Sequence, residues 1–92
     1  MNEKKYPFNG YKNAHNIEFR IVRLKNEVDE IRMAKQVDIC LIEKIEHLIE
    51  LLEDVLQAAL CYNSQGIAYL TGKQVRLAKE SVVWAENIRQ KY

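Results

Sequence analysis

The chain has 92 residues, of which 48% are hydrophobic and 29% charged, and its formal net charge is +1. This length suits one small domain, and the composition excludes the disordered class, which combines low hydrophobicity with high net charge. No apolar run approaches the roughly 18–20 residues of a membrane helix, and the chain does not begin like a signal peptide. We therefore expect a single cytoplasmic domain over residues 1–92.

Turn-forming residues are scarce, with 3 Gly and 1 Pro in the whole chain. An all-β chain needs a turn every ~8–12 residues, so the composition predicts an all-α fold. Cys40 and Cys61 fall within helical apolar patterns and lack the spacing of a metal-binding pair. We expect both to be small buried hydrophobic residues.

The first segment, residues 1–13, is polar and rich in aromatic residues. Pro7 and the pair Asn9-Gly10 favour turns, so this segment is predicted to be a short N-terminal arm. Helix signals begin at about Asn13 to Asn16, either of which can cap a helix.

A long apolar stripe follows over about residues 14–61. It consists of Ile17, Ile21, Leu24, Val28 and Ile31, and resumes in phase with Ile42, Ile45, Ile49, Leu52, Leu56 and Ala59. Lys35 and Asp38 interrupt the stripe, which leaves two interpretations. Because the phase survives and no Gly or Pro intervenes, we prefer one long or kinked helix of about 70 Å; a tight turn at Lys35–Asp38 would instead give two antiparallel helices.

The second half of this stretch has a wide apolar face, since Leu41, Leu48 and Val55 run beside the main stripe. A wide face implies contact with at least two other helices. A thin helical chain of this length cannot cover such a face alone, so we expect a homo-oligomer.

Residues 62–71 are predicted to be a loop and residues 72–91 the last helix. Thr71 and Gln74 have the spacing of a capping box, in which each side chain accepts a hydrogen bond from a free backbone N–H of the other residue. The inner face of this helix is expected to contain Leu77, Ala78, Ser81, Val82, Trp84, Ala85 and Ile88.

The charge is strongly segregated: residues 1–25 carry six bases and two acids, residues 26–62 three bases and nine acids, and residues 63–92 five bases and two acids. The basic lead interleaves lysines with Tyr6, Phe8 and Tyr11, a combination that suits a ligand with a π-face and a phosphate. Duplex nucleic acid is a poor candidate, because the acidic middle would repel it.

Catalytic motifs are absent from the sequence: it has no Gly-rich phosphate loop, zinc-binding pattern or nucleophile signature. The cluster of Glu43, Glu46, His47 and Glu50 has no second copy, whereas di-metal sites in helical bundles need one. We expect no enzyme activity, cofactor or metal site.

Two segments together resemble a known family. They are Phe8-Asn9-Gly10-Tyr11-Lys12 followed by Arg23-Leu24-Lys25-Asn26, and the later run Arg76-Leu77-Ala78-Lys79-Glu80-Ser81-Val82-Val83-Trp84-Ala85. The pair resembles the small phage helical-hairpin proteins that act as cyclic-nucleotide sponges against CBASS and Thoeris immunity. The matches cover about 40 of the 92 residues, with short helical motifs.

The resemblance implies a long helical hairpin assembled into a homo-oligomer, with a hexamer as the expected state. It implies that cyclic di- or trinucleotides, or cyclic ADP-ribose isomers, are held between protomers in the host cytoplasm without cleavage. By position, Tyr11 would stack on a base and Lys25 would contact a phosphate, with Arg23 as a rival for that role. Lys12 and Asn26 are their neighbours, and Arg76 would be a second phosphate contact.

The alternative function is a small helical regulatory protein that docks its wide apolar face on a partner protein and binds no small molecule.

Overall fold

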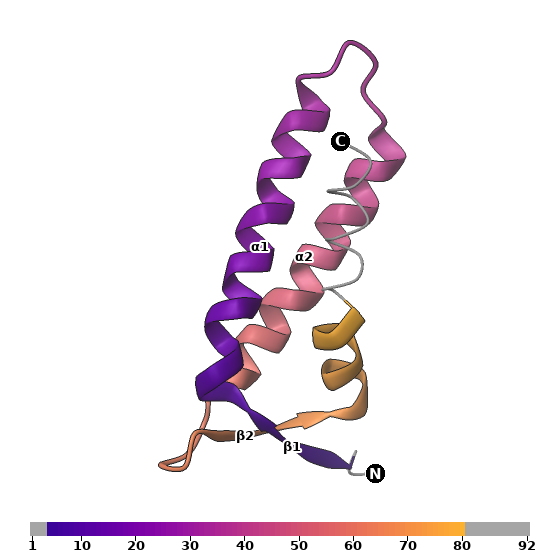
Figure 1. Cartoon of the computed structure of the whole chain (residues 1–92). Coiled ribbons are helices and arrows are strands. Elements are labelled where there is room, and N and C mark those ends of the chain that lie inside the picture. The colour runs from indigo at the N-terminus through magenta and orange to yellow at the C-terminus, as the bar shows by residue number, and fades with distance from the viewer. Residues whose placement is uncertain (1–3, 81–92) are drawn as a thin grey trace.

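The computed structural model describes residues 4–80, which form a helical hairpin closed at one end by a two-stranded sheet (Figure 1). The elements are β1 (Lys5–Asn9), α1 (Gly10–Arg32), α2 (Ile39–Leu60) and β2 (Ile67–Thr71), and residues 72–80 are again helical. The all-α prediction is therefore right in its mostly helical character and wrong in having no strands.

The start of α1 lies earlier than the sequence suggested. Asn9, and not Asn13 or Asn16, is the N-cap: its Oδ1 accepts a hydrogen bond from the backbone N–H of Lys12 at 2.9 Å. Asn13 donates from its side-chain amide to the Asn9 carbonyl at 2.8 Å. Since the cap is the last residue of β1, the first turn of α1 occupies residues that were predicted to belong to the arm.

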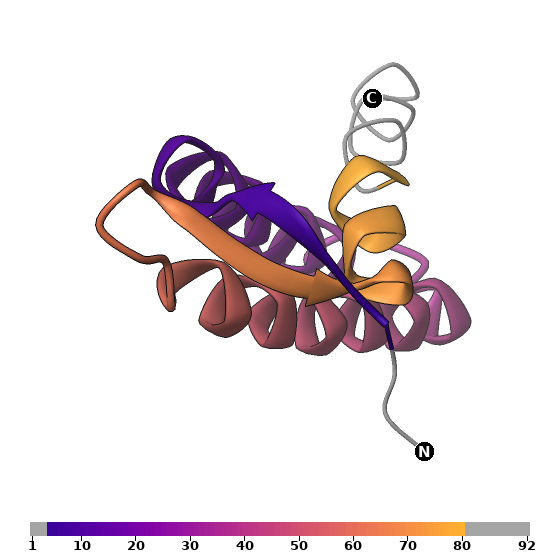
Figure 2. The same ribbon diagram turned by 90° about the horizontal axis from the view of Figure 1, so that it is seen from below.

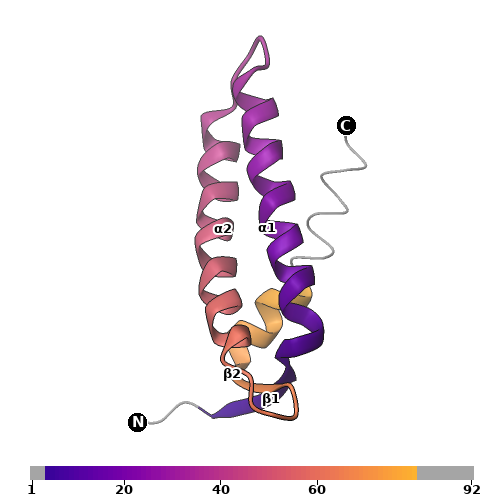
Figure 3. The same cartoon turned by 90° about the vertical axis from the view of Figure 1, so that its left-hand side faces the viewer.

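The chain reverses direction at residues 33–38, so the predicted continuous helix over 14–61 is wrong and the tight turn is observed (Figure 3). Asp38 caps α2 by accepting a hydrogen bond from the Leu41 backbone N–H at 3.0 Å. A turn here keeps the charged Lys35 and Asp38 exposed and lets the two apolar stripes face each other. The Asp38 cap thus begins a new helix although no Gly or Pro lies between α1 and α2.

The core lies between the two helices and follows the predicted stripes, except that Val55 of the neighbouring row is buried where Leu56 was expected. Ile17, Ile21, Leu24, Val28 and Ile31 of α1 are buried against Ile42, Ile45, Ile49, Leu52, Val55 and Ala59 of α2. Leu41, Leu48 and Leu56 are partly buried at the edges of this cluster. Full burial of one such side chain contributes roughly 1.5–3 kcal/mol, so this stripe is the main source of the hairpin's stability.

The two strands pair antiparallel across the base of the hairpin, with Lys5 opposite Thr71 and Asn9 opposite Ile67. Figure 2 shows this ribbon crossing beneath both helices. Ala68 and Leu70 of β2 are buried against the helices, while Tyr69 between them is 57% exposed. Segments predicted as an arm over 1–13 and a loop over 62–71 are therefore strands in part, because each covers the other's backbone groups.

The last helix begins as predicted. The backbone N–H of Gln74 donates to Thr71 Oγ1 at 3.2 Å, and the N–H of Thr71 donates to Gln74 Oε1 at 3.0 Å, which confirms the capping box. Ala78 is buried, and Arg20 of α1 donates from Nη1 to the Ala78 carbonyl at 2.9 Å. The expected end at residue 91 and the positions Ser81, Val82, Trp84, Ala85 and Ile88 lie outside the described residues.

The cysteine prediction is wrong, since Cys40 and Cys61 are both exposed. Cys40 lies in the first turn of α2 and Cys61 is its C-cap, and both positions are off the buried stripe. Within residues 4–80, none of the helices has the length and apolar character required to cross a membrane.

Candidate functional site

The base of the molecule, formed by residues 4–17 and 55–79, carries no acidic residue. It carries six bases, which are Lys4, Lys5, Lys12, Lys73, Arg76 and Lys79. Residues 18–54, which form the rest of the hairpin, carry ten acids and six bases. The ribbon and the ends of the two helices thus gather positive charge at one end of a long molecule, where the local potential favours an anion.

Tyr11 is the most exposed tyrosine of this base, with 71% of its surface accessible in the first turn of α1. Its ring meets that of Tyr62 edge to face, with centroids 5.7 Å apart and an interplanar angle of 78°. One face of a ring held in this way stays open to a stacking partner.

The backbone around Tyr11 is fixed by the loop after α2. The Tyr11 N–H donates to the Gly66 carbonyl at 3.2 Å. Asn63 holds that loop, because its Oδ1 accepts from the N–H groups of Gln65 and Ile67 at 2.9 and 3.1 Å. Gly66 has a positive φ of 80°, and a Cβ there would lie 2.9 Å from the Tyr11 Cβ. A glycine is therefore required for the loop to pass this close to Tyr11.

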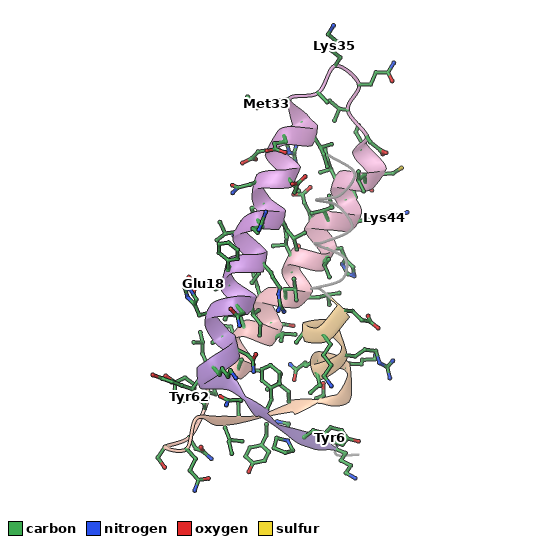
Figure 4. The ribbon with its side chains drawn as sticks, in the orientation of Figure 1. Tyr6, Glu18, Met33, Lys35, Lys44 and Tyr62 are labelled. Atoms are coloured by element: carbon green, nitrogen blue, oxygen red, sulfur yellow. The ribbon has the colours of Figure 1, made fainter. Side chains whose placement is uncertain are left out.

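Two further tyrosines lie on the ribbon, Tyr69 at the middle of β2 and Tyr6 near the end of β1 away from Tyr11. The register pairs Pro7 with Tyr69, which places both on the solvent side of the sheet with Lys5 one position along the same face. Lys4 Nζ lies 5.5 Å from the centroid of the Tyr6 ring, a cation–π distance. Figure 4 shows Tyr62 and Tyr6 at opposite ends of the base.

Lys25, the predicted phosphate contact, lies away from this base. It is fourteen residues from Tyr11 along α1, about 21 Å at 1.5 Å per residue. Its Nζ lies 3.7 Å from Glu53 Oε1, and both side chains are more than half exposed. An ion pair this exposed contributes little stability and leaves Lys25 free to reorient.

The groove beside Lys25 is acidic. It has a volume of about 470 Å³ between α1 and α2. The groove is lined by Lys25, Val28, Asp29, Arg32, Glu46, Ile49, Glu50 and Glu53. Arg32 is paired there with Glu46 at 3.2 Å. Four carboxylates against two cations make this groove a poor place for a phosphate.

The other predicted contacts are dispersed. Arg23 lies across the Phe19 ring, 5.5 Å from its centroid. Two residues turn a helix by about 200°, so Arg23 and Lys25 lie on different sides of α1. Asn26 is exposed on α1, and Arg76 is exposed on the last helix. Of the predicted set, only Tyr11, Lys12 and Arg76 belong to the basic end.

Sequence reasoning missed Tyr62 and Tyr69 as parts of this surface. The signal available was the absence of Asp and Glu from residues 55–79, a segment that we interpreted mainly as loop and helix start. Their closeness to Tyr11, Pro7 and Lys5 depends on the pairing of β1 with β2, which a sequence alone does not give.

Glu27 is a further titratable group that the sequence did not single out. It lines a groove of about 330 Å³ near the turn, together with Glu30, Ile31, Ala34, Gln36, Asp38 and Leu41. Its Oε2 is buried and has no hydrogen-bond partner within residues 4–80. Burial raises the pKa of this carboxyl, and the Glu30 carboxylate raises it further, while Arg23 opposes both effects.

Metal-binding geometry is not found among the described residues, where no three His, Cys, Asp or Glu side chains converge. Glu43, Glu46, His47 and Glu50 are all exposed along α2. No family model, curated protein or solved structure matches this chain.

Proposed function

We propose that this protein binds small anionic signalling nucleotides and sequesters them without cleavage, in the manner of a phage sponge against CBASS- or Thoeris-type defence. The ligands would be cyclic di- or trinucleotides or cyclic ADP-ribose isomers, captured in the host cytoplasm. The observation that carries the proposal is the Tyr11 ring, 71% exposed at an end of the molecule that has six bases and no acid among residues 4–17 and 55–79.

The chemistry of this surface matches both halves of a nucleotide. An open tyrosine ring stacks on a base, and stacking of this kind is worth ~1–3 kcal/mol per base. Lys12, in the same turn of α1, supplies a charge for the phosphate, and Arg76 and Lys73 supply more at the other end of β2. We assign the phosphate contacts to these base cations in preference to Lys25, Arg23 and Asn26.

A homo-oligomer, for which we propose a hexamer, completes this function. Tyr11 and Arg76 lie beyond opposite ends of β2, whose five residues span about 16 Å at 3.3 Å per residue, so we expect the stacking ring and the guanidinium of one site to come from two copies. A second copy that brings its Arg76 toward Tyr11 would close the site, and symmetric ligands suit symmetric seams.

The test is a thermal-shift panel of cyclic di- and trinucleotides and ADP-ribose isomers. At a ligand concentration about 100 times Kd, we expect a rise in Tm on the order of 10 °C. Tyr11→Ala and Lys12→Ala should remove the rise and leave the Tm of the free protein nearly unchanged. Lys35→Ala is the matched control, because Lys35 is an exposed lysine at the opposite tip of the hairpin (Figure 4).

Two outcomes would contradict this assignment. If no ligand of the panel raises Tm, the proposed function is wrong. A shift that survives Tyr11→Ala but is lost in Lys25→Ala moves the site to the groove between α1 and α2. Recovery of intact ligand after heat denaturation tests the absence of cleavage.

The second candidate function is a helical regulator that docks on a partner protein. It is favoured by Phe19 and Val22 of α1, which are 54% and 49% exposed. Such a regulator would give no thermal shift with any nucleotide.

A further inference from the structure

The outward face of α1 carries large apolar side chains. Phe19 is two residues from Ile17 and from Ile21, both buried, so at about 100° per residue it points away from the core. Phe19 is 54% exposed, and Val22, on the next turn of the same face, is 49% exposed. A helix that packed only through its core stripe would carry polar residues here.

Each of the two flanks of this face carries one basic and one acidic residue. The order of the two charges along the chain differs between the flanks. Lys12 and Glu30 are eighteen residues apart, five full turns, so they lie on one flank near opposite ends of α1. Glu18 and Lys25 are seven residues apart, about two turns, and lie on the other flank. Both pairs are exposed, and Glu18 points away from α2 (Figure 4). One flank runs from base to acid along the chain and the other from acid to base.

We propose that this face binds the same face of a second copy, with the two α1 helices antiparallel about a twofold axis level with residue 21. Lys12 then lies level with Glu30 of the second copy, and Glu18 lies within one residue of the level of Lys25. Phe19 is level with Arg23 of the second copy and next to its Val22. A twofold axis repeats each contact, so the face is complementary to itself.

The charge order suits this arrangement. An antiparallel pair about a twofold axis brings each flank against the same flank of the second copy, so a flank with a base near one end and an acid near the other puts opposite charges level with each other. Lys25 is already 3.7 Å from Glu53, but that pair is exposed and permits a second acidic neighbour. The ion pairs therefore set the register of the antiparallel pair, while burial of Phe19 and Val22 supplies the affinity. Arg23 already lies across the Phe19 ring of its own chain, and it can make the same cation–π contact with the Phe19 ring of the second copy.

Mass measurement of the full chain by light scattering and sedimentation, without nucleotide, tests the pairing. We expect an assembly with an even number of chains. Phe19→Glu and Val22→Glu should each weaken it at least tenfold and halve the mass near the dissociation midpoint, with the helical circular dichroism unchanged. Ile39→Glu is the matched control, since Ile39 is an exposed apolar residue at the start of α2, off this face.

Charge reversal tests the register. Glu30→Lys should weaken the assembly, because the introduced ammonium group would face Lys12 of the second copy, and the double variant Lys12→Glu with Glu30→Lys should restore it. A monomer at every concentration, an odd-numbered assembly, or an assembly that survives both Phe19→Glu and Val22→Glu overturns the pairing. The mass measurements contain no nucleotide, so they test the pairing separately from the proposed function. A dimer whose Tm does not rise with any nucleotide would support the pairing and contradict only the proposed function.

Discussion

Gly10 is the residue at which α1 comes closest to the end of α2. It is buried at the first position of α1, directly after the Asn9 cap. A Cβ added there would overlap the carbonyl oxygen of Ala59 and lie 3.2 Å from the Tyr62 Cβ. The glycine thus allows both helices and the Tyr11–Tyr62 pair to converge at the base.

We therefore expect Gly10→Ala to destabilise the fold by about 2 kcal/mol, in the range of overpacked cores. For a domain of this size the loss corresponds to a drop in Tm on the order of 10 °C. The control is Gly72→Ala, whose Cβ would meet only the Tyr6 ring, at an ordinary 3.6 Å. Equal melting temperatures for the two variants would contradict this account of Gly10.

Glu27 makes stability depend on pH. Its pKa in the folded protein is raised above the ordinary 4.5, mainly by burial and then by Glu30. Ionisation is therefore harder in the folded than in the unfolded state, so stability falls as the pH rises from about 4.5 through the folded-state pKa. Below that window both states are protonated and Glu27 carries no such penalty.

Glu27→Gln is accordingly expected to raise Tm at pH 7 and to lose this advantage by pH 4. Melting curves of the variant and of the native protein at both pH values measure the effect. Glu43→Gln, the same change at an exposed position of α2, controls for the loss of one negative charge. A lower Tm of Glu27→Gln at pH 7 would show that this carboxylate has a favourable partner.

At the level of whole elements, the hairpin depends on its caps more than on turn residues. The turn over residues 33–38 contains neither Gly nor Pro, and α2 begins where Asp38 accepts the N–H of Leu41 at 3.0 Å. Continuous apolar phase across this region is compatible with one helix or with two. Burial of apolar surface favours two helices, because only a reversed chain covers the apolar stripe of α1 with that of α2.

Asp38→Ala should therefore cost about 1 kcal/mol, the usual value of an N-cap. Asp38→Asn should retain most of the stability, since an asparagine side chain also accepts this bond. Lys35→Ala, in the same turn, should change little. Chemical denaturation of the three variants compares these costs, and an undiminished stability of Asp38→Ala would mean that the turn is held by other contacts.

At the level of the whole molecule, charge is ordered along the long axis. The base, residues 4–17 and 55–79, is basic and rich in tyrosine, whereas the hairpin above it carries ten acids. This order separates the surface proposed for anions, around Tyr11 and Lys12, from the face of α1 proposed for a second copy. The two surfaces share only Lys12. The mass of the assembly therefore reports on one surface and ligand binding on the other.

Parts of this architecture could be predicted from the sequence because they depend on local periodicity. The stripe from Ile17 to Ile31, the stripe from Ile42 to Ala59 and the Thr71–Gln74 capping box all follow from residue types at fixed spacing. Tyr11 and Lys12 could likewise be singled out, as an aromatic beside a base, and their part in ligand binding stays a prediction.

Only the tertiary structure decided the rest. The reversal at residues 33–38, the pairing of β1 with β2 and the contact of Tyr11 with Tyr62 all join residues far apart in the chain. The same holds for Lys25, whose acidic neighbours Glu46, Glu50 and Glu53 come from the opposite helix. Periodicity fixes which face of a segment is apolar, but the partner that covers the face is chosen by burial over the whole chain.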